Sequence, residues 1–256
     1  MMKIFAAAAL ACVLSAVFGR VLIPVLRALK AGQSIREIGP TWHNNKAGTP
    51  MMGGLMFIFA VILILIGNAF FMMDYSVFFV LILALCFGFI GFLDDFTKIK
   101  YKRNLGLTSI QKACLQMAVS ALFLYILYKE GIMSASLYIP FFDVSFKLHP
   151  ILYIFFAMFV FVGCVNAVNL TDGLDGLSSG ICTIVTATIG LLGFFMGRRD
   201  VCIIALSLSG AILGFLPYNF HPASVFVGDC GAQFMGFTIA ALSLLGFKST
   251  ALITLG

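Results

Sequence analysis

Apolar runs long enough to cross a lipid bilayer recur along this chain and constrain its fold more than any other feature. A helix that spans the hydrocarbon core needs roughly 20 apolar residues. Because 62% of the residues are hydrophobic and only 10% are charged, the chain has too little polar surface to cover a soluble globule. The sequence therefore predicts an all-α, polytopic transmembrane helical bundle, a single integral membrane domain over residues 1–256. We expect eight spans, at residues 4–29, 51–73, 76–93, 110–128, 150–168, 178–196, 201–216 and 232–247.

Two segments lie outside this regular pattern. A fresh apolar run follows Lys248 and predicts the start of a ninth span over residues 249–256. The segment between Lys129 and His149 alternates apolar and polar residues, so we expect a small extracytoplasmic hairpin near residues 134–148.

The seven cysteines lie in or beside apolar runs without the paired spacing of a metal site, which indicates core residues.

Counting the crossings assigns the polar breaks to two sides. The breaks at 30–50, 94–109, 169–177 and 217–231 share one side, and the turns near 74, 129–149, 198–200 and 248 share the other. Basic residues favour the first side, so the positive-inside rule predicts that it faces the cytoplasm, with the N-terminus outside. The nine basic residues of the first side are Arg27, Lys30, Arg36, Lys46, Lys98, Lys100, Lys102, Arg103 and Lys112, against six on the other: Lys3, Lys129, Lys147, Arg198, Arg199 and Lys248.

Five aspartates next to helix ends are the strongest functional signal: Asp94, Asp95, Asp172, Asp175 and Asp229. Each could be an ordinary cap or turn residue, and Asp172 and Asp175 in their glycine-rich turn fit that reading well. Ionisable groups at the edge of a membrane are costly, however, and five of them on one side indicate a site. Oxygen ligands from short carboxylates suit Mg²⁺, and no His/Cys set competes for zinc.

Other polar residues on the same side extend this candidate site. Lys46, Lys98 and Lys112 could neutralise phosphates or could anchor the chain at the lipid headgroups. Three asparagines, Asn166, Asn169 and Asn219, lie near helix ends. Carboxylates, lysines and glycines together indicate phosphoryl chemistry on a diphosphate at the membrane surface. A Walker A pattern is absent, which argues against ATP hydrolysis, and no basic cluster indicates nucleic acid.

Five segments carry a resemblance to a known family. They are residues 39–54 (GPTWHNNKAGTPMMGG), Leu93-Asp94-Asp95, Gly106-Leu107 followed by Lys112, residues 166–177 (NAVNLTDGLDGL) and residues 226–231 (FVGDCG). In order and spacing they resemble the polyprenyl-phosphate N-acetylhexosamine-1-phosphate transferases along nearly the whole chain. Within that superfamily, the first segment most closely resembles the phospho-N-acetylmuramoyl-pentapeptide transferases.

The resemblance implies a reaction, a cofactor and a set of site residues. UDP-N-acetylmuramoyl-pentapeptide and undecaprenyl phosphate would react at the bacterial plasma membrane, with Mg²⁺, to give UMP and the first lipid-linked peptidoglycan precursor. It also implies a homodimer embedded in membrane lipid. Carried over by motif, the catalytic and metal-binding residues are Asp94, Asp95 and Asp229. The substrate-binding residues are Lys46, Thr49, Lys112, Asn166, Asn169, Asp172, Asp175 and Asn219.

Two mechanisms fit this family of reactions. A lipid phosphate is mostly dianionic at neutral pH, which favours direct attack on the donor in a single displacement, with Asp94 orienting or deprotonating the acceptor. The rival mechanism uses an aspartate as covalent nucleophile. Relatives continue through two further spans joined by a histidine-rich cytoplasmic loop, so we expect this chain, which stops before both, to be weakly active or inactive.

Two other functions fit the pattern. A sister transferase that moves N-acetylglucosamine-1-phosphate to the same lipid would share the chemistry and differ in the sugar. An ion-coupled transporter would also hold carboxylates in a membrane domain, but transporters bury such groups near the midplane within broken helices. The aspartates here lie at one interface, which favours an enzyme.

Overall fold

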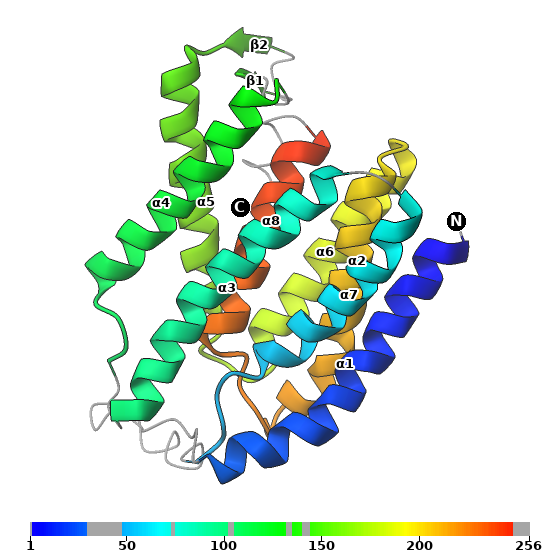
Figure 1. The fold of residues 1–256 in the computed structure, drawn as a ribbon, viewed down its shortest axis with the longest axis vertical. Helices are drawn as coiled ribbons and strands as arrows, with labels where there is room; N and C mark the ends of the chain where they lie inside the picture. Colours follow the sequence, from blue (N-terminus) through cyan, green and yellow to red (C-terminus); the bar gives the residue numbers. More distant parts are fainter. Residues whose placement is uncertain are drawn as a thin grey trace.

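The computed structural model describes residues 2–29, 48–72, 75–101, 105–131, 135–139 and 144–247. These residues form a bundle of eight helices with one two-stranded hairpin (Figure 1). The predicted all-α membrane bundle is confirmed. The elements in chain order are α1 (Met2–Ala28), α2 (Gly54–Met72), α3 (Tyr75–Tyr101), α4 (Ser109–Lys129), β1 (Ser136–Ile139), β2 (Val144–Lys147), α5 (Pro150–Thr171), α6 (Leu177–Phe195), α7 (Arg199–Asn219) and α8 (Gly228–Phe247).

Length and composition mark six of the described helices as able to cross a membrane. They are α1, α4, α5, α6, α7 and the part of α3 from Phe79, while the apolar part of α2, Gly54–Asn68, is shorter. The predicted number of eight spans thus stays a prediction. The proposed ninth span at 249–256 lies outside the described residues.

The bundle has two distinct ends. The hairpin projects beyond α4 and α5 at one end, with Ser136 paired to Lys147 and Ile139 to Val144, which confirms the predicted hairpin (Figure 1). At the other end α1, α3, α5 and α7 finish and α2, α4, α6 and α8 begin. The helix ends that flank the four predicted motif-bearing breaks therefore share one end of the molecule.

Several helices run further than hydropathy predicted. α3 continues to Tyr101 instead of ending at 93, so Asp94 and Asp95 lie within a helix and not in a polar break. α8 begins at Gly228 instead of 232, which places Asp229 in its first turn. Hydropathy marks where apolar side chains stop, whereas a helix continues as long as its backbone and side chains find partners. α5 and α7 similarly extend to Thr171 and Asn219.

A cluster of four buried phenylalanines packs three helices onto α8. The Phe237 ring of α8 stacks on Phe87 of α3 at 4.4 Å, and lies 5.4 Å from Phe123 of α4 and 5.5 Å from Phe161 of α5. All four side chains are fully buried. Because Phe237 is eight residues after Asp229, this packing fixes α3, α4 and α5 around α8 about two turns from the motif-bearing end.

Glycines allow α7 to touch α1. A Cβ added at Gly210 would clash with the backbone carbonyl of Ala8, and one at Gly214 would clash with that of Cys12. Lipid offers helices no hydrophobic driving force to associate, so such close packing through small residues is an important source of contact. α7 is buried along nearly its whole length as a result.

This contact predicts the effect of adding one methyl group. Gly210→Ala should lower the stability of the bundle by about 1–3 kcal/mol, because α1 and α7 must separate to admit it. Gly163→Ala is the matched control, since Gly163 also lies within a helix but has open space around its Cα. Thermal unfolding of the detergent-purified variants by circular dichroism would measure both; equal melting temperatures would contradict the packing.

Candidate active site at the junction of α3, α4 and α8

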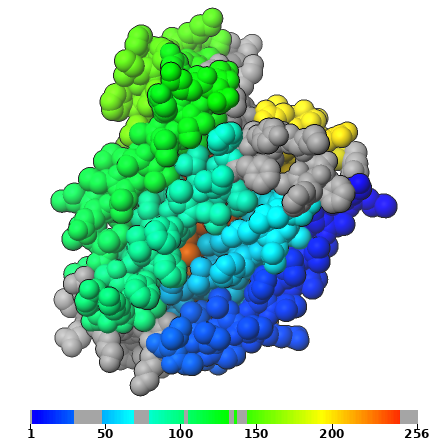
Figure 2. Space-filling model, in the orientation of Figure 1, coloured from blue at the N-terminus to red at the C-terminus, as the bar shows by residue number. Residues whose placement is uncertain are grey.

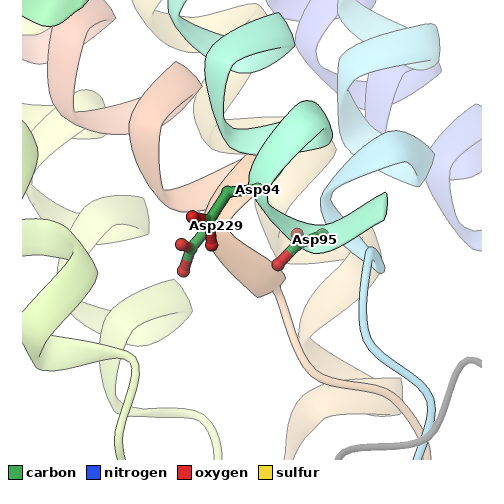
Figure 3. A group of neighbouring side chains, drawn as sticks. All are labelled: Asp94, Asp95 and Asp229. Atoms are coloured by element: carbon green, nitrogen blue, oxygen red, sulfur yellow. The ribbon is translucent and has the colours of Figure 1, made fainter. Parts of the chain in front are cut away.

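Three aspartates meet where the end of α3 reaches the start of α8 (Figure 3). Asp94 and Asp95 come from α3 and Asp229 from the first turn of α8, and one carboxylate oxygen from each lies within 4.8 Å of the others. Asp94 and Asp95 are buried, and the Asp229 side chain is 13% exposed. Three carboxylates this close repel one another strongly unless cations compensate them.

Two lysines supply the compensation. The Lys98 ammonium lies 2.6 Å from Asp94, 3.5 Å from Asp95 and 3.2 Å from Asp229. Lys112, from the first turn of α4, lies 2.5 Å from Asp229 and 3.5 Å from Asp94. With all five groups ionised, the cluster retains one net negative charge. Both lysine side chains are less than one-fifth exposed, at 19% and 15%.

Local structure explains why these groups converge. Lys98 follows Asp94 by four residues and Asp95 by three, spacings that bring side chains together on a helix. The turn before α4 also contacts Asp94, whose Oδ1 accepts a 2.8 Å hydrogen bond from the Leu107 amide. Thr108 then caps α4 in a capping box with Gln111, which fixes where the helix begins and hence where Lys112 lies.

Free amides at the start of α8 bind two further carboxylate oxygens. Asp95 Oδ2 accepts a 3.1 Å hydrogen bond from the Cys230 amide, and Asp172 Oδ2 accepts one of 3.2 Å from the Gly228 amide. A helix N-terminus has unpaired N–H groups and a positive dipole end, so it favours carboxylates there. Desolvation nevertheless raises the pKa of Asp172 well above its usual value.

Segment 50–54 fixes the loop that precedes α8. The Phe226 amide donates to the Pro50 carbonyl, and the amides of Gly53 and Gly54 donate to the carbonyls of Phe226 and Val227. These three bonds of 2.8–2.9 Å form a short strand-like pairing. The first and fifth sequence motifs are thus joined through their backbones, which fixes the start of α8 and with it Asp229.

Comparison with known proteins identifies the family. The model of Glycosyl transferase family 4 matches residues 77–247, a range that contains all three aspartates and both lysines. The phospho-N-acetylmuramoyl-pentapeptide-transferase of Bacillus pumilus (strain SAFR-032) is 42% identical over 245 residues, which cover 95% of this chain and 75% of that relative. The chain belongs to the phospho-N-acetylmuramoyl-pentapeptide-transferase family.

Other relatives agree. The protein of that name from Clostridium perfringens (strain 13 / Type A) is 40% identical over 259 residues, covering 99% of this chain and 79% of the relative. The one from Oceanobacillus iheyensis is 43% identical over 241 residues, covering 92% and 73%. The resemblance seen in the sequence is confirmed, and the apolar helices and bacterial relatives make this transferase a multi-pass bacterial membrane protein.

The predicted substrate-binding residues of this transferase lie within the cluster or near it. Lys112 lies within it, and Asp172 contacts the α8 start as described. Asp175 lies beside the turn after α7, where its Oδ2 contacts His221 Nδ1 at 3.0 Å and the Ala223 amide at 3.3 Å. Asn219 is buried, and its amide accepts from Ser179 and Gly176 and donates to Val225. It joins α6 to the turn that precedes α8.

Asn166, which is partly buried, begins a hydrogen-bonded chain with two buried glutamines below the cluster. Its Nδ2 donates to Gln116 Oε1 at 2.9 Å, and Gln116 Nε2 donates to Gln233 Oε1 at 3.3 Å. Gln116 follows Lys112 by four residues and Gln233 follows Asp229 by four, so this network repeats the Lys112–Asp229 pairing one helical turn deeper. It links α4, α5 and α8 and holds the two charged groups in register.

For the remaining predicted residues, the structure gives no side-chain contact with the cluster among the described residues. Asn169 lies in the last turn of α5, where its carbonyl accepts from the Asp172 amide. Thr49 is half-buried next to the paired residue Pro50. Lys46 lies outside the described residues. The substrate contacts of these residues stay predictions.

Lys98 is the site residue that sequence reasoning undervalued. Hydropathy ends this helix at residue 93 and so places Lys98 among the lysines of a loop. Once α3 is extended, the Asp-Asp-x-x-Lys spacing of 94–98 places an ammonium beside both carboxylates. The interaction of His221 with Asp175 was likewise not predicted, since those residues are 46 positions apart.

Removing the Lys98 charge tests this arrangement. Lys98→Met should lower stability by about 3 kcal/mol when divalent cations are chelated, because it leaves buried carboxylates uncompensated. Added Mg²⁺ should restore more of the melting temperature in this variant than in the parent, since a hard cation would no longer compete with the Lys98 ammonium for the three carboxylates. Lys100→Met, at an exposed position on the same helix, is the control; equal effects of both substitutions would rule out the arrangement.

Proposed function

We propose that this chain transfers phospho-N-acetylmuramoyl-pentapeptide from its UDP-linked donor to undecaprenyl phosphate, releasing UMP and forming a lipid-linked peptidoglycan precursor. The observation that carries the proposal is the cluster of three aspartates and two lysines at one end of an apolar bundle, in a chain about 40% identical to relatives that bear this name. A site at the end of the bundle would serve a water-soluble donor and a lipid acceptor together.

Charge supports Mg²⁺ as the cofactor. The ionised cluster keeps one net negative charge, and both substrates are anionic. The two lysines alone therefore cannot offset the repulsion between the cluster and its substrates. Asp94, Asp95 and Asp229 provide the oxygen donors that Mg²⁺ prefers, close enough together to share one ion. These three residues would hold it, and when bound it would neutralise charge on the donor diphosphate.

The protein groups around the ion have separate roles in this proposal. Lys98 and Lys112 would stabilise the phosphates, and Asp94 would orient or deprotonate the acceptor. An oxygen of the lipid phosphate attacks the phosphorus that bears the sugar, the bond from that phosphorus to the bridging oxygen breaks, and UMP leaves with that oxygen. Since a phosphate monoester is mostly dianionic at neutral pH, the attack needs no covalent enzyme intermediate.

The donor would lie on the side of the cluster formed by Asn169, Asp172 and Asp175. This side is built from the end of α5, the turn before α6 and the turn before α8, and Asp175 with His221 lies at its edge. We place this end of the bundle in the cytoplasm on the distribution of basic residues, with the N-terminus outside. The homodimer implied by the resemblance stays an expectation.

Release of UMP tests the donor. We expect the detergent-purified chain, given Mg²⁺ and undecaprenyl phosphate, to release UMP from UDP-N-acetylmuramoyl-pentapeptide and not from UDP-N-acetylglucosamine. Release from the glucosamine donor alone would assign the chain to the sister transferases. If neither donor reacts with this chain, the same assay on a chain extended to the length of its relatives must show release for the proposal to hold.

A second measurement separates the two mechanisms. With donor labelled on the sugar-bearing phosphate, rapid acid quench should find label only in donor and lipid, because a single displacement leaves nothing on the protein. Label bound to an aspartate, formed and lost fast enough to account for turnover, would overturn the single displacement. Omission of the acceptor is the control, and UMP should then not form.

A further inference from the structure

The hairpin formed by β1 and β2 carries an apolar pair on one face. Successive side chains of a strand project to opposite faces, so Val144 and Phe146 share one face of β2, and Ser145 and Lys147 share the other. Val144 is 44% exposed and Phe146 42%. The green part of the chain that contains the hairpin stands above the rest of the bundle (Figure 2). The described part of the chain therefore leaves this apolar pair open.

A hairpin of two strands needs a surface to pack on. Alone in water it is marginally stable at best, and a third strand or another apolar surface must support it. The β1–β2 ladder also continues toward the membrane-crossing helices, because the Leu148 amide donates to the Ala135 carbonyl at 2.8 Å. α5 begins two residues later, at Pro150. The hairpin is thus fixed directly at the start of α5.

The helix ends beside the hairpin have the side chains of a membrane surface. α4 and α5 are long and apolar enough to cross a bilayer, and only 28% of the apolar window of each is buried, which leaves their outer faces to lipid. α4 ends with the exposed Tyr125 and Tyr128, and the Lys129 ammonium lies 5.8 Å from the centroid of the Tyr125 ring. Tyrosines and lysines of this kind are typical of the headgroup level. The hairpin therefore starts at the headgroup level.

We propose that the β1–β2 hairpin lies on the bilayer surface at the end of the bundle opposite the aspartate–lysine cluster. Val144 and Phe146 enter the boundary between headgroups and acyl chains, and Ser145 and Lys147 face the water. The hairpin then anchors the connection between α4 and α5 to lipid, in the manner of an interfacial amphipathic segment. Under the proposed orientation this is the extracytoplasmic leaflet.

Tethering favours lipid over a protein as the occupant of this face. The hairpin joins two membrane-crossing helices, so lipid is always within its reach, whereas a protein partner would lose translational and rotational freedom on binding. The apolar pair is also continuous along the chain with the lipid-facing start of α5, where Ile151 and Leu152 are exposed. The bilayer therefore covers this face without a further component.

Photo-crosslinking in liposomes tests the contact. Phe146 and Ser145, neighbours on opposite faces of β2, are replaced in turn by p-benzoylphenylalanine in the full chain, and phosphatidylglycerol with radiolabelled acyl chains is the probe. We expect about tenfold more lipid adduct at position 146, corresponding to about 1.4 kcal/mol of preference for lipid on that face. Phe159, which is 77% exposed on the outer face of α5, is the reference for full lipid contact. Equal yields at positions 145 and 146 would overturn the proposal.

The same gels distinguish lipid from protein as the occupant. A second copy of the chain on the apolar face would give a crosslinked dimer from position 146 in place of the lipid adduct, and this result would also overturn the proposal.

A charge placed on each face gives an independent check. Val144→Glu puts a carboxylate on the apolar face and should reduce the lipid adduct at position 146 about tenfold, because a charged group resists transfer into the acyl region. Ser145→Glu adds the same charge on the opposite face and should leave the adduct unchanged. Equal effects of the two substitutions would contradict the assignment of faces. Melting temperatures identify a variant that fails to fold, and the comparison of positions 145 and 146 does not depend on either glutamate.

Discussion

Compensation of three crowded carboxylates by two lysines is the interaction on which the arrangement of α3, α4 and α8 depends. Asp94 and Asp95 lie on one helix and Asp229 on another, and neither helix could bring its carboxylates to this junction without Lys98 and Lys112. The two lysines compensate two of the three carboxylate charges, so the ionised cluster has one net negative charge. That remainder is what makes the cluster suited to a divalent cation and to reacting phosphates, where a fully neutral cluster would serve structure alone.

The apolar part of the bundle supports this charged end. Buried aromatic contacts around Phe237 fix α3, α4 and α5 against α8, and the amide network from Asn166 through Gln116 to Gln233 sets their register one turn below the lysine pair. Backbone pairing of residues 50–54 with Phe226 and Val227 holds the start of α8 from the α2 side. The site thus lies on packed helices rather than on loops, which keeps its five charged groups in fixed positions.

The sequence was sufficient to predict the bundle, the hairpin and the grouping of the motifs at one end, because apolar run length and turn chemistry are local properties. It predicted that Asp94, Asp95, Asp229 and Lys112 would share a site. The predicted end of α3 and the predicted start of α8 were wrong, because hydropathy does not detect helical residues whose polar side chains form ion pairs. That error hid the role of Lys98. The partners of Asn166, Asp175 and Asn219 could not be predicted either, because Gln116, His221 and Ser179 come from distant positions and nothing local specifies those contacts.

The central claim is that the aspartate–lysine cluster carries out the transfer. Its most direct test is single-turnover formation of organic-extractable N-acetylmuramoyl-pentapeptide lipid by the parent and by Asp229→Asn. The account predicts that Asp229→Asn, which removes the carboxylate bound by both lysines, slows this step at least about 100-fold. Asp200→Asn, which breaks an ion pair with Arg198 at the opposite end of the bundle, should leave it unchanged. Equal rates for the parent and Asp229→Asn would contradict the account.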